Sequence, residues 1–168
     1  GNVTLLKHAS NVTGCAKALE NAFLEAGFPE GIFQHIGIEI NQVESVIAAD
    51  IVHGITLTGS EGAGSSVAAL AGMHIKKTVM ELGGSDAFIV FNDANLEKSA
   101  EVAAHSRMLN AGQACICAKR FIVTEKVEDE FVSLFAKNIQ SLQQGDPLKK
   151  GIQLGPLARL DLADTLAN

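Results

Sequence analysis

Apolar residues recur along the chain in two alternating patterns, short β-branched runs and longer stretches with helical spacing. The short runs predict strands at residues 3–7, 33–37, 54–58, 78–82, 87–91 and 121–124. The longer stretches predict helices at residues 13–26, 42–49, around 67–71, at 96–109 and at 127–142. Since strands that alternate with helices over short links require right-handed parallel crossovers, the pattern predicts an α/β fold.

A pair of glycines marks the predicted domain boundary. Gly83 and Gly84 separate two apolar strands, and paired glycines permit a sharp change of direction. We therefore predict one domain at residues 1–82 and a second at residues 83–168. We also expect the chain to be an internal piece of a longer protein, because a strand-like run begins almost at once without a Met and residues 160–168 read as a helix cut short.

Composition narrows the classes of function. The chain carries a net charge of −6 with no Lys/Arg cluster and no Trp or Tyr, which argues against a nucleic-acid partner. The sequence has no unbroken run of about 20 apolar residues, so we expect no membrane partner. Three cysteines are too few for a disulfide framework, and no CxxC or HExxH spacing suggests a metal site. We expect a reduced, cytoplasmic setting.

Cys115 is the first candidate for chemistry. It lies in Asn110-Ala111-Gly112-Gln113-Ala114-Cys115-Ile116-Cys117, where small residues and a glycine let the backbone approach a ligand closely. A nucleophilic thiol needs partial exposure and open backbone donors for the oxyanion that it creates. The same composition also suits a small buried hydrophobic side chain. The residues alone leave both interpretations open.

Glu81 is the second candidate, at the end of an apolar strand and directly before the glycine pair. A carboxylate in that place is expected to be partly desolvated, which suits a general base. The alternative is an ordinary solvated carboxylate at a strand end. Here too the pattern leaves both possibilities open.

A glycine-rich turn and a lysine suggest a ligand that carries phosphate. Residues 59–64, with Gly59, Ser60 and Gly64, follow a strand and open a helix, where backbone N–H groups can meet a phosphate. The run does not fit G-x-G-x-x-G, and a simple tight turn explains it equally well. Lys7 ends the first predicted strand, where ligands of open α/β sheets gather.

Several of these segments, taken together, resemble the aldehyde dehydrogenase superfamily along nearly the whole chain. The matching motifs, in the family's order, are Leu5-Leu6-Lys7, Leu57-Thr58-Gly59-Ser60, Glu81-Leu82-Gly83-Gly84, Gly112-Gln113-Ala114-Cys115 and Leu154-Gly155-Pro156-Leu157-Ala158-Arg159. Residues 81–90 are most similar to the succinate-semialdehyde dehydrogenase branch. The resemblance implies a Rossmann-like portion of a parallel sheet in residues 1–82, followed by part of an α/β catalytic domain in residues 83–168.

The resemblance also implies catalytic roles. Cys115, and not Cys117, is the expected nucleophile, and Glu81 is the expected base that activates the hydrolytic water. The reaction implied is oxidation of an aldehyde, with succinate semialdehyde as a candidate, through a thiohemiacetal and a thioester. The family's oxyanion asparagine lies upstream of Gly1, so we expect the isolated chain to be inactive. Some succinate-semialdehyde enzymes carry an arginine for the substrate carboxylate six residues before the cysteine, where this chain has Leu109.

Cofactor residues follow from the same resemblance. Lys7 is expected to bind the adenosine ribose of NAD or NADP, and the backbone of Leu82 is expected near the nicotinamide. The family places Gly59, Ser60 and Gly64 beside the pyrophosphate. Many relatives that prefer NAD have a glutamate three residues after this lysine, whereas this chain has Ser10, which predicts appreciable use of NADP. We also expect a homo-oligomer in the full-length protein.

Two alternatives remain, one within enzymes and one from another functional class. A CoA-acylating relative would pass the thioester to a thiol, which makes the water-activating Glu81 unnecessary. A structural relative would keep the fold without turnover, and a catalytically incomplete fragment would behave in the same way. Cys117 also has two interpretations, a small buried side chain or a thiol that resolves an oxidised Cys115.

Overall fold

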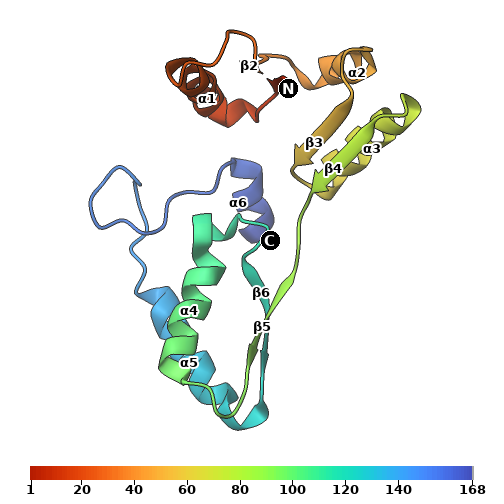
Figure 1. Cartoon of the computed structure of the whole chain (residues 1–168). Helices are drawn as coiled ribbons and strands as arrows, with labels where there is room; N and C mark the ends of the chain where they lie inside the picture. Colours follow the sequence, from red (N-terminus) through yellow and green to blue (C-terminus); the bar gives the residue numbers. More distant parts are fainter. Residues whose placement is uncertain (168) are drawn as a thin grey trace. The chain divides into compact units, whose positions relative to one another are not determined.

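The computed structural model describes residues 1–167, and the chain divides into two compact units (Figure 1). The first unit contains residues 1–58 and 62–81, and the second contains residues 59–61 and the part from Leu82 onward. Each unit alternates strands with helices, as in the α/β fold predicted. The assignment of nucleotide binding to residues 1–82 and of catalysis to residues 83–168 stays a prediction.

Two parallel strand pairs form the first unit. Strand β1 (Thr4–Leu6) pairs with β2 (Phe33–His35), and helix α1 (Thr13–Glu25) connects them. Strand β3 (Gly54–Thr58) pairs with β4 (Lys77–Glu81), and helix α3 (Glu61–Met73) connects them. The short helix α2 (Val43–Ala48) lies between the two pairs in the sequence. Both connections are the crossovers that parallel strands require.

The second unit is built on strands β5 (Asp86–Val90) and β6 (Ala118–Val123), which also pair in parallel. Helices α4 (Leu96–Met108) and α5 (Glu128–Gln140) pack against each other and cover one face of this pair (Figure 1). Helix α6 (Leu160–Ala167) follows near the C-terminus. Short 3-10 turns occur at Ser10–Val12, Ile40–Gln42, Leu109–Gly112 and Glu125–Val127.

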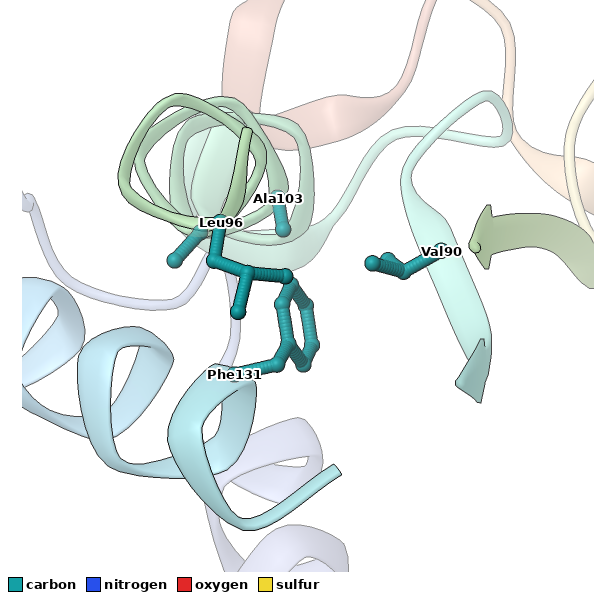
Figure 2. Close-up of a cluster of buried hydrophobic side chains, with 5 residues drawn as sticks. Val90, Leu96, Ala103 and Phe131 are labelled. Carbon is teal, nitrogen blue, oxygen red and sulfur yellow. The ribbon is translucent and has the colours of Figure 1, made fainter. Parts of the chain in front are cut away.

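The core of the second unit joins the helices to the strands. Figure 2 shows Val90 of β5, Leu96 and Ala103 of α4, and Phe131 of α5 pointing toward one another. Phe131 is only 2% exposed, which makes it the largest side chain among the fully buried ones. Burial of such a side chain stabilises a fold by roughly 1.5–3 kcal/mol. Val90 pairs with Val123 at the end of β6 and Leu96 is the first residue of α4, so this core joins the ends of the strands and of α4 that are distant from residues 109–117.

Strand β6 begins earlier than the sequence predicts. The apolar run suggested a start at residue 121, whereas pairing begins at Ala118, opposite Asp86. The sequence pattern did not indicate this earlier start, because Lys119 and Arg120 are not typical strand residues. Pairing with a neighbouring strand outweighs their low strand propensity. The guanidinium of Arg120 also donates from Nε to the Ser85 carbonyl at 2.9 Å. The strand therefore starts directly after Cys117.

The glycine pair acts differently from the expectation. Neither Gly83 nor Gly84 has a positive φ, so the backbone there follows a path that other residues can adopt. A Cβ built on Gly84 would lie 3.3 Å from the carbonyl oxygen of Cys115, which is tighter than an ordinary contact. Gly84 is thus needed for close approach to another segment and not for a sharp turn.

Candidate active site

Residues 109–117 form a loop between α4 and β6, which we call the nucleophile loop. Three consecutive residues in it have left-handed backbone conformations, with φ of 51° at Asn110, 55° at Ala111 and 78° at Gly112. Asparagine and glycine tolerate this region, whereas alanine disfavours it because of its Cβ. Strained residues of this kind tend to occur at functional sites and persist only where the surrounding structure holds them.

The two cysteines of the loop have opposite environments. Cys115 is exposed, whereas Cys117 is fully buried at 0% exposure. The Cys117 thiol donates to the Leu109 carbonyl across 3.5 Å, and its backbone N–H donates to Ala114. A buried thiol with these partners is a packed structural side chain, whereas an exposed thiol is accessible to a substrate. This difference agrees with the choice of Cys115 over Cys117 as the candidate nucleophile.

Parallel pairing explains which segment faces Cys115. The segments that precede two parallel strands lie at the same edge of a sheet, and here they are residues 83–85 before β5 and 115–117 before β6. That arrangement brings the Gly84 backbone against the Cys115 carbonyl. Two motifs that are 31 residues apart in the sequence therefore meet in the second unit.

Two cationic side chains hold the backbone of the nucleophile loop. The Lys119 ammonium donates to the carbonyls of Cys115 at 2.8 Å and Ala114 at 3.3 Å. The half-buried Arg107 guanidinium lies 3.5 Å from the carbonyls of Gly112 and Ala118, which are at the two ends of the segment 112–118 that contains Cys115. The positive φ at Gly112 favours glycine, and a Cβ there would lie 2.8 Å from Arg107 Nη2, so the Arg107 side chain would have to shift to accept another residue.

Gln113 links the loop to a distant segment. Its Nε2 donates to the Asn110 carbonyl at 3.0 Å, and its Oε1 accepts from the Ala158 N–H at 2.9 Å. Ala158 belongs to the Leu154–Arg159 motif that the sequence singled out. This contact could not be predicted from the sequence, since neither the spacing of the motifs nor their composition encodes it. Gln113, Arg107 and Lys119 are thus functional candidates that sequence reasoning missed.

Glu81 is the last residue of β4 and lies opposite Thr58, the last residue of β3. The glycine turn that follows Thr58 therefore starts at the same sheet edge as Glu81, in the place where parallel sheets bind ligands. The Glu81 side chain is exposed among the residues of this chain, and its partial desolvation stays a prediction for the full-length protein.

The predicted cofactor residues lie at the ends of strands or at the start of a helix. Lys7 follows β1 and is exposed, and its ammonium donates to the His8 carbonyl at 3.2 Å. Ser10 is also exposed and begins the 3-10 turn before α1. Ser60 is exposed directly before α3, and Gly64 is buried inside its first turns. Leu82, the first residue after β4, is half-buried.

These positions suit the parts of a dinucleotide. An ammonium and a hydroxyl near the end of β1 can hydrogen-bond a ribose or its phosphate. The 13-residue helix α3 presents its positive end after a glycine turn, although Glu61 also occupies its first turn. The described residues contain no group of three or more His, Cys, Asp or Glu side chains arranged to hold a metal ion.

The last matching motif ends in an ion pair. Arg159 donates from Nε and Nη2 to the two carboxylate oxygens of Asp161, each at 2.8 Å. These hydrogen bonds, with the attraction of the opposite charges, lower the pKa of Asp161 and raise the pKa of Arg159. Both groups are exposed, so the pair orients the start of α6 and adds little stability.

Among the helices of the described part of the chain, none combines the length and apolar character that crossing a membrane requires.

Comparisons with known proteins agree with the motifs. The model of the aldehyde dehydrogenase family matches residues 1–168. A probable succinate-semialdehyde dehydrogenase (NADP(+)) of Synechocystis sp. is 52% identical over 168 residues, which cover 99% of this chain and 37% of that protein. The succinate-semialdehyde dehydrogenase (NADP(+)) of Deinococcus radiodurans is 47% identical over 158 residues, which cover 94% of this chain and 33% of that protein.

A solved structure has the same fold. The crystal structure of succinic semialdehyde dehydrogenase from Streptococcus pyogenes in complex with NADP+ aligns with a TM-score of 0.94 and 43% identity, over 99% of this chain and 37% of that one. The chain thus spans about a third of the length of the relatives it matches. Since the family model covers every residue, and the fold and the motifs agree with it, the chain belongs to the aldehyde dehydrogenase family.

Proposed function

We propose that the full-length protein containing this chain oxidises an aldehyde to the carboxylic acid with NADP, or with NAD, as the hydride acceptor. The observation that carries the proposal is the exposed Cys115 thiol on a strained, braced loop, two residues from a fully buried cysteine. The identity with relatives named succinate-semialdehyde dehydrogenases supports it.

Cys115 is the nucleophile of this proposal. Its thiolate attacks the aldehyde carbon, and the backbone N–H of Cys115 donates to the oxyanion that forms. Gly84 leaves space beside the Cys115 backbone, because a Cβ there would lie only 3.3 Å from the carbonyl oxygen. A bound nicotinamide would supply the acceptor for the hydride that leaves this adduct, and a thioester would then remain on Cys115.

Glu81 is the base that completes the turnover. It takes a proton from water, the hydroxide adds to the thioester carbon, and the Cys115 thiolate leaves with release of the acid. Only two residues lie between Glu81 and Gly84, so covalent geometry limits the distance between their Cα atoms to roughly 11 Å. The exposure of Glu81 at a strand end gives it access to water.

Residues of the first strands and of the α3 turn would hold the cofactor. Lys7 would bind the adenosine ribose, while Gly59, Ser60 and Gly64 would lie beside the pyrophosphate. Ser10 would leave room for a 2′-phosphate, since it is small and neutral. The names of the relatives, which specify NADP(+), support this preference.

Succinate semialdehyde is the proposed substrate, on the strength of the relatives' names. Leu109 stands where some such enzymes have an arginine, and the nearby Arg107 guanidinium points to the backbone of the nucleophile loop. The substrate carboxylate must therefore be bound by other groups. The proposal also includes a cytoplasmic, reducing setting, which keeps the three thiols free, and a homo-oligomeric assembly.

The experiment that tests this function follows the absorbance of NADPH and NADH with the full-length protein. Succinate semialdehyde is compared with an uncharged aldehyde of the same chain length, and each is tested with both cofactors. We expect turnover with succinate semialdehyde and NADP, and release of succinate. Turnover that requires CoA and yields an acyl-CoA would overturn the hydrolytic mechanism.

A further inference from the structure

The side chain of Gln113 makes two hydrogen bonds, one as a donor and one as an acceptor. Its amide nitrogen donates 3.0 Å to the Asn110 carbonyl, inside the left-handed turn. Its amide oxygen accepts at 2.9 Å from the backbone N–H of Ala158, which is 45 residues away. All three residues belong to the second unit. The amide is used at both ends, which a carboxylate or an apolar side chain at this position cannot reproduce.

The turn that Gln113 holds needs support. Asn110 and Ala111 have φ near +50°, and Ala111 has a Cβ that disfavours this conformation. The Asn110 carbonyl accepts from both the backbone N–H and the side chain of Gln113, so one residue closes the turn twice. Cys115 follows two residues later, with its neighbour Ile116 67% exposed. The turn before Cys115 and the Lys119 hydrogen bonds to the Ala114 and Cys115 carbonyls are the contacts that hold the backbone of the thiol.

The second bond anchors this turn to a different segment. Among the described residues, the side-chain hydrogen bonds of Arg107, Cys117 and Lys119 stay between the end of α4 and the start of β6. Gln113 reaches beyond this region to Ala158, just before the Arg159–Asp161 ion pair and α6. It thereby couples the nucleophile loop to the Leu154–Arg159 motif.

We propose that Gln113 is a positioning residue for the Cys115 thiol. It fixes the left-handed turn through Asn110 and ties that turn to Ala158, so that the Cys115 thiol is presented in a single direction. This inference rests on the proposed function of Cys115 as the nucleophile. Loss of the amide should lower the rate of attack while leaving aldehyde binding nearly unchanged, since Gln113 acts through Cys115.

Three variants of the full-length protein separate this role from general stability. Gln113→Met keeps the length of the side chain and removes both hydrogen bonds. Gln113→Glu keeps an oxygen for the Ala158 N–H and lacks the donor for the Asn110 carbonyl. Gln153→Met is the matched control, because the Gln153 side chain accepts from the Gln143 N–H at 3.0 Å in the same unit, away from the nucleophile loop.

Two measurements report on Cys115. The first is kcat against KM for aldehyde oxidation. The second is the rate of Cys115 alkylation by iodoacetamide, read by mass spectrometry of tryptic peptides without any aldehyde or cofactor. The exposed Cys15 lies in another peptide of the first unit and serves as the internal reference. The thermal midpoint of each variant measures the loss of stability.

We expect Gln113→Met to lower kcat about tenfold or more with KM within about twofold, because small misplacements of a reacting group are costly. Alkylation of Cys115 relative to Cys15 should fall in parallel, and the thermal midpoint should match that of Gln153→Met. Gln113→Glu should lie between wild type and Gln113→Met. Equal kcat and alkylation in Gln113→Met and Gln153→Met would overturn the inference.

The alkylation measurement keeps this inference apart from the proposed function. If the wild-type protein oxidises no aldehyde, the proposed function fails, and the relative alkylation of Cys115 in Gln113→Met still decides the role of Gln113. If the wild type turns over and Gln113→Met matches it within about twofold in both readouts, the inference fails and the proposed function stands.

Discussion

The two units differ in how firmly they hold their candidate residues. In the second unit, Val90, Leu96, Ala103 and Phe131 form a packed core between the strands and the two helices. In the first unit, the buried apolar side chains among the described residues are only Ala16, Ile47 and Ala71. Within this chain, the thiol thus belongs to a unit with a packed core, whereas Lys7, Ser10 and Glu81 belong to strand pairs in which residues 1–81 alone form little core. Substitutions in the two units should therefore have different consequences.

The largest expected effect is at the nucleophile. In the full-length protein, Cys115→Ala should abolish aldehyde oxidation, a loss of several orders of magnitude, because no other group forms the thioester. Cofactor binding, measured by fluorescence quenching or calorimetry, should stay nearly intact, since the cofactor residues proposed lie elsewhere. Inactivation by Cys117→Ala together with activity in Cys115→Ala would show that the motif has been assigned to the wrong cysteine.

The base should have the next largest effect. Glu81→Gln should lower steady-state turnover by roughly 10²- to 10⁴-fold, the range of general acid–base catalysis. Thioester formation does not need this base, so rapid mixing should show a burst of reduced cofactor near one equivalent per site. Absence of the burst would mean that Glu81 acts before hydride transfer.

The contrast between the cores can be tested by stability. Phe131→Ala should destabilise the full-length protein by about 3–5 kcal/mol, measured by urea denaturation, because it leaves a cavity in the packed core. Phe23→Ala in the first unit should cost less, since Phe23 is only half-buried and stacks on Phe33. Val132→Ala is the control next to Phe131, because Val132 is 52% exposed. A loss at Phe23 equal to that at Phe131 would contradict the contrast.

Cofactor preference should change more modestly. Ser10→Glu should shift the ratio of kcat/KM values toward NAD on the order of tenfold, which corresponds to about 1.4 kcal/mol of repulsion between the carboxylate and a 2′-phosphate. Ser10→Gln is the uncharged control of similar size. An equal change of this ratio in both variants would show that the size of the side chain, and not its charge, determines the cofactor preference.

Cys117 should give the smallest effect. Its burial favours the packing interpretation, so Cys117→Ala should keep kcat within a few-fold of the wild type. Treatment with mild peroxide should inactivate both proteins, and dithiothreitol should restore both to the same extent, because a buried thiol cannot reach an oxidised Cys115 without opening the loop. Recovery in the wild type alone would show that the loop opens and that Cys117 resolves the sulfenic acid.

Periodicity was sufficient for most of the fold, because strands and helices of this chain follow strong local patterns. The predicted start of β6 was too late, because Lys119 and Arg120 belong to the strand through its pairing with β5 and not through their own strand propensity. The reason for Gly84 was also missed, because close approach to Cys115 depends on a segment 31 residues away.

The sequence suffices to propose candidate residues for the site, and it does not reveal the contacts that support them. The family motifs identify Cys115 and Glu81 as candidates, yet no local pattern could reveal that Glu81 is exposed or that Gln113 contacts Ala158. Such facts depend on the pairing of distant segments. Sequence therefore indicates which groups could react, and the structure adds what holds them.

The bond between Gln113 and Ala158 has a consequence for the order of folding. Closing a loop of 45 residues costs more chain entropy than the shorter contacts within β5, α4 and β6. During synthesis, Ala158 also leaves the ribosome after α4 and α5 have been made. The hydrogen bond between Gln113 and Ala158 should therefore form after these helices. Pulse-labelled hydrogen exchange during refolding should show the Ala158 amide protected after those of α4, so a nascent chain would gain its helices before its reactive thiol is in place.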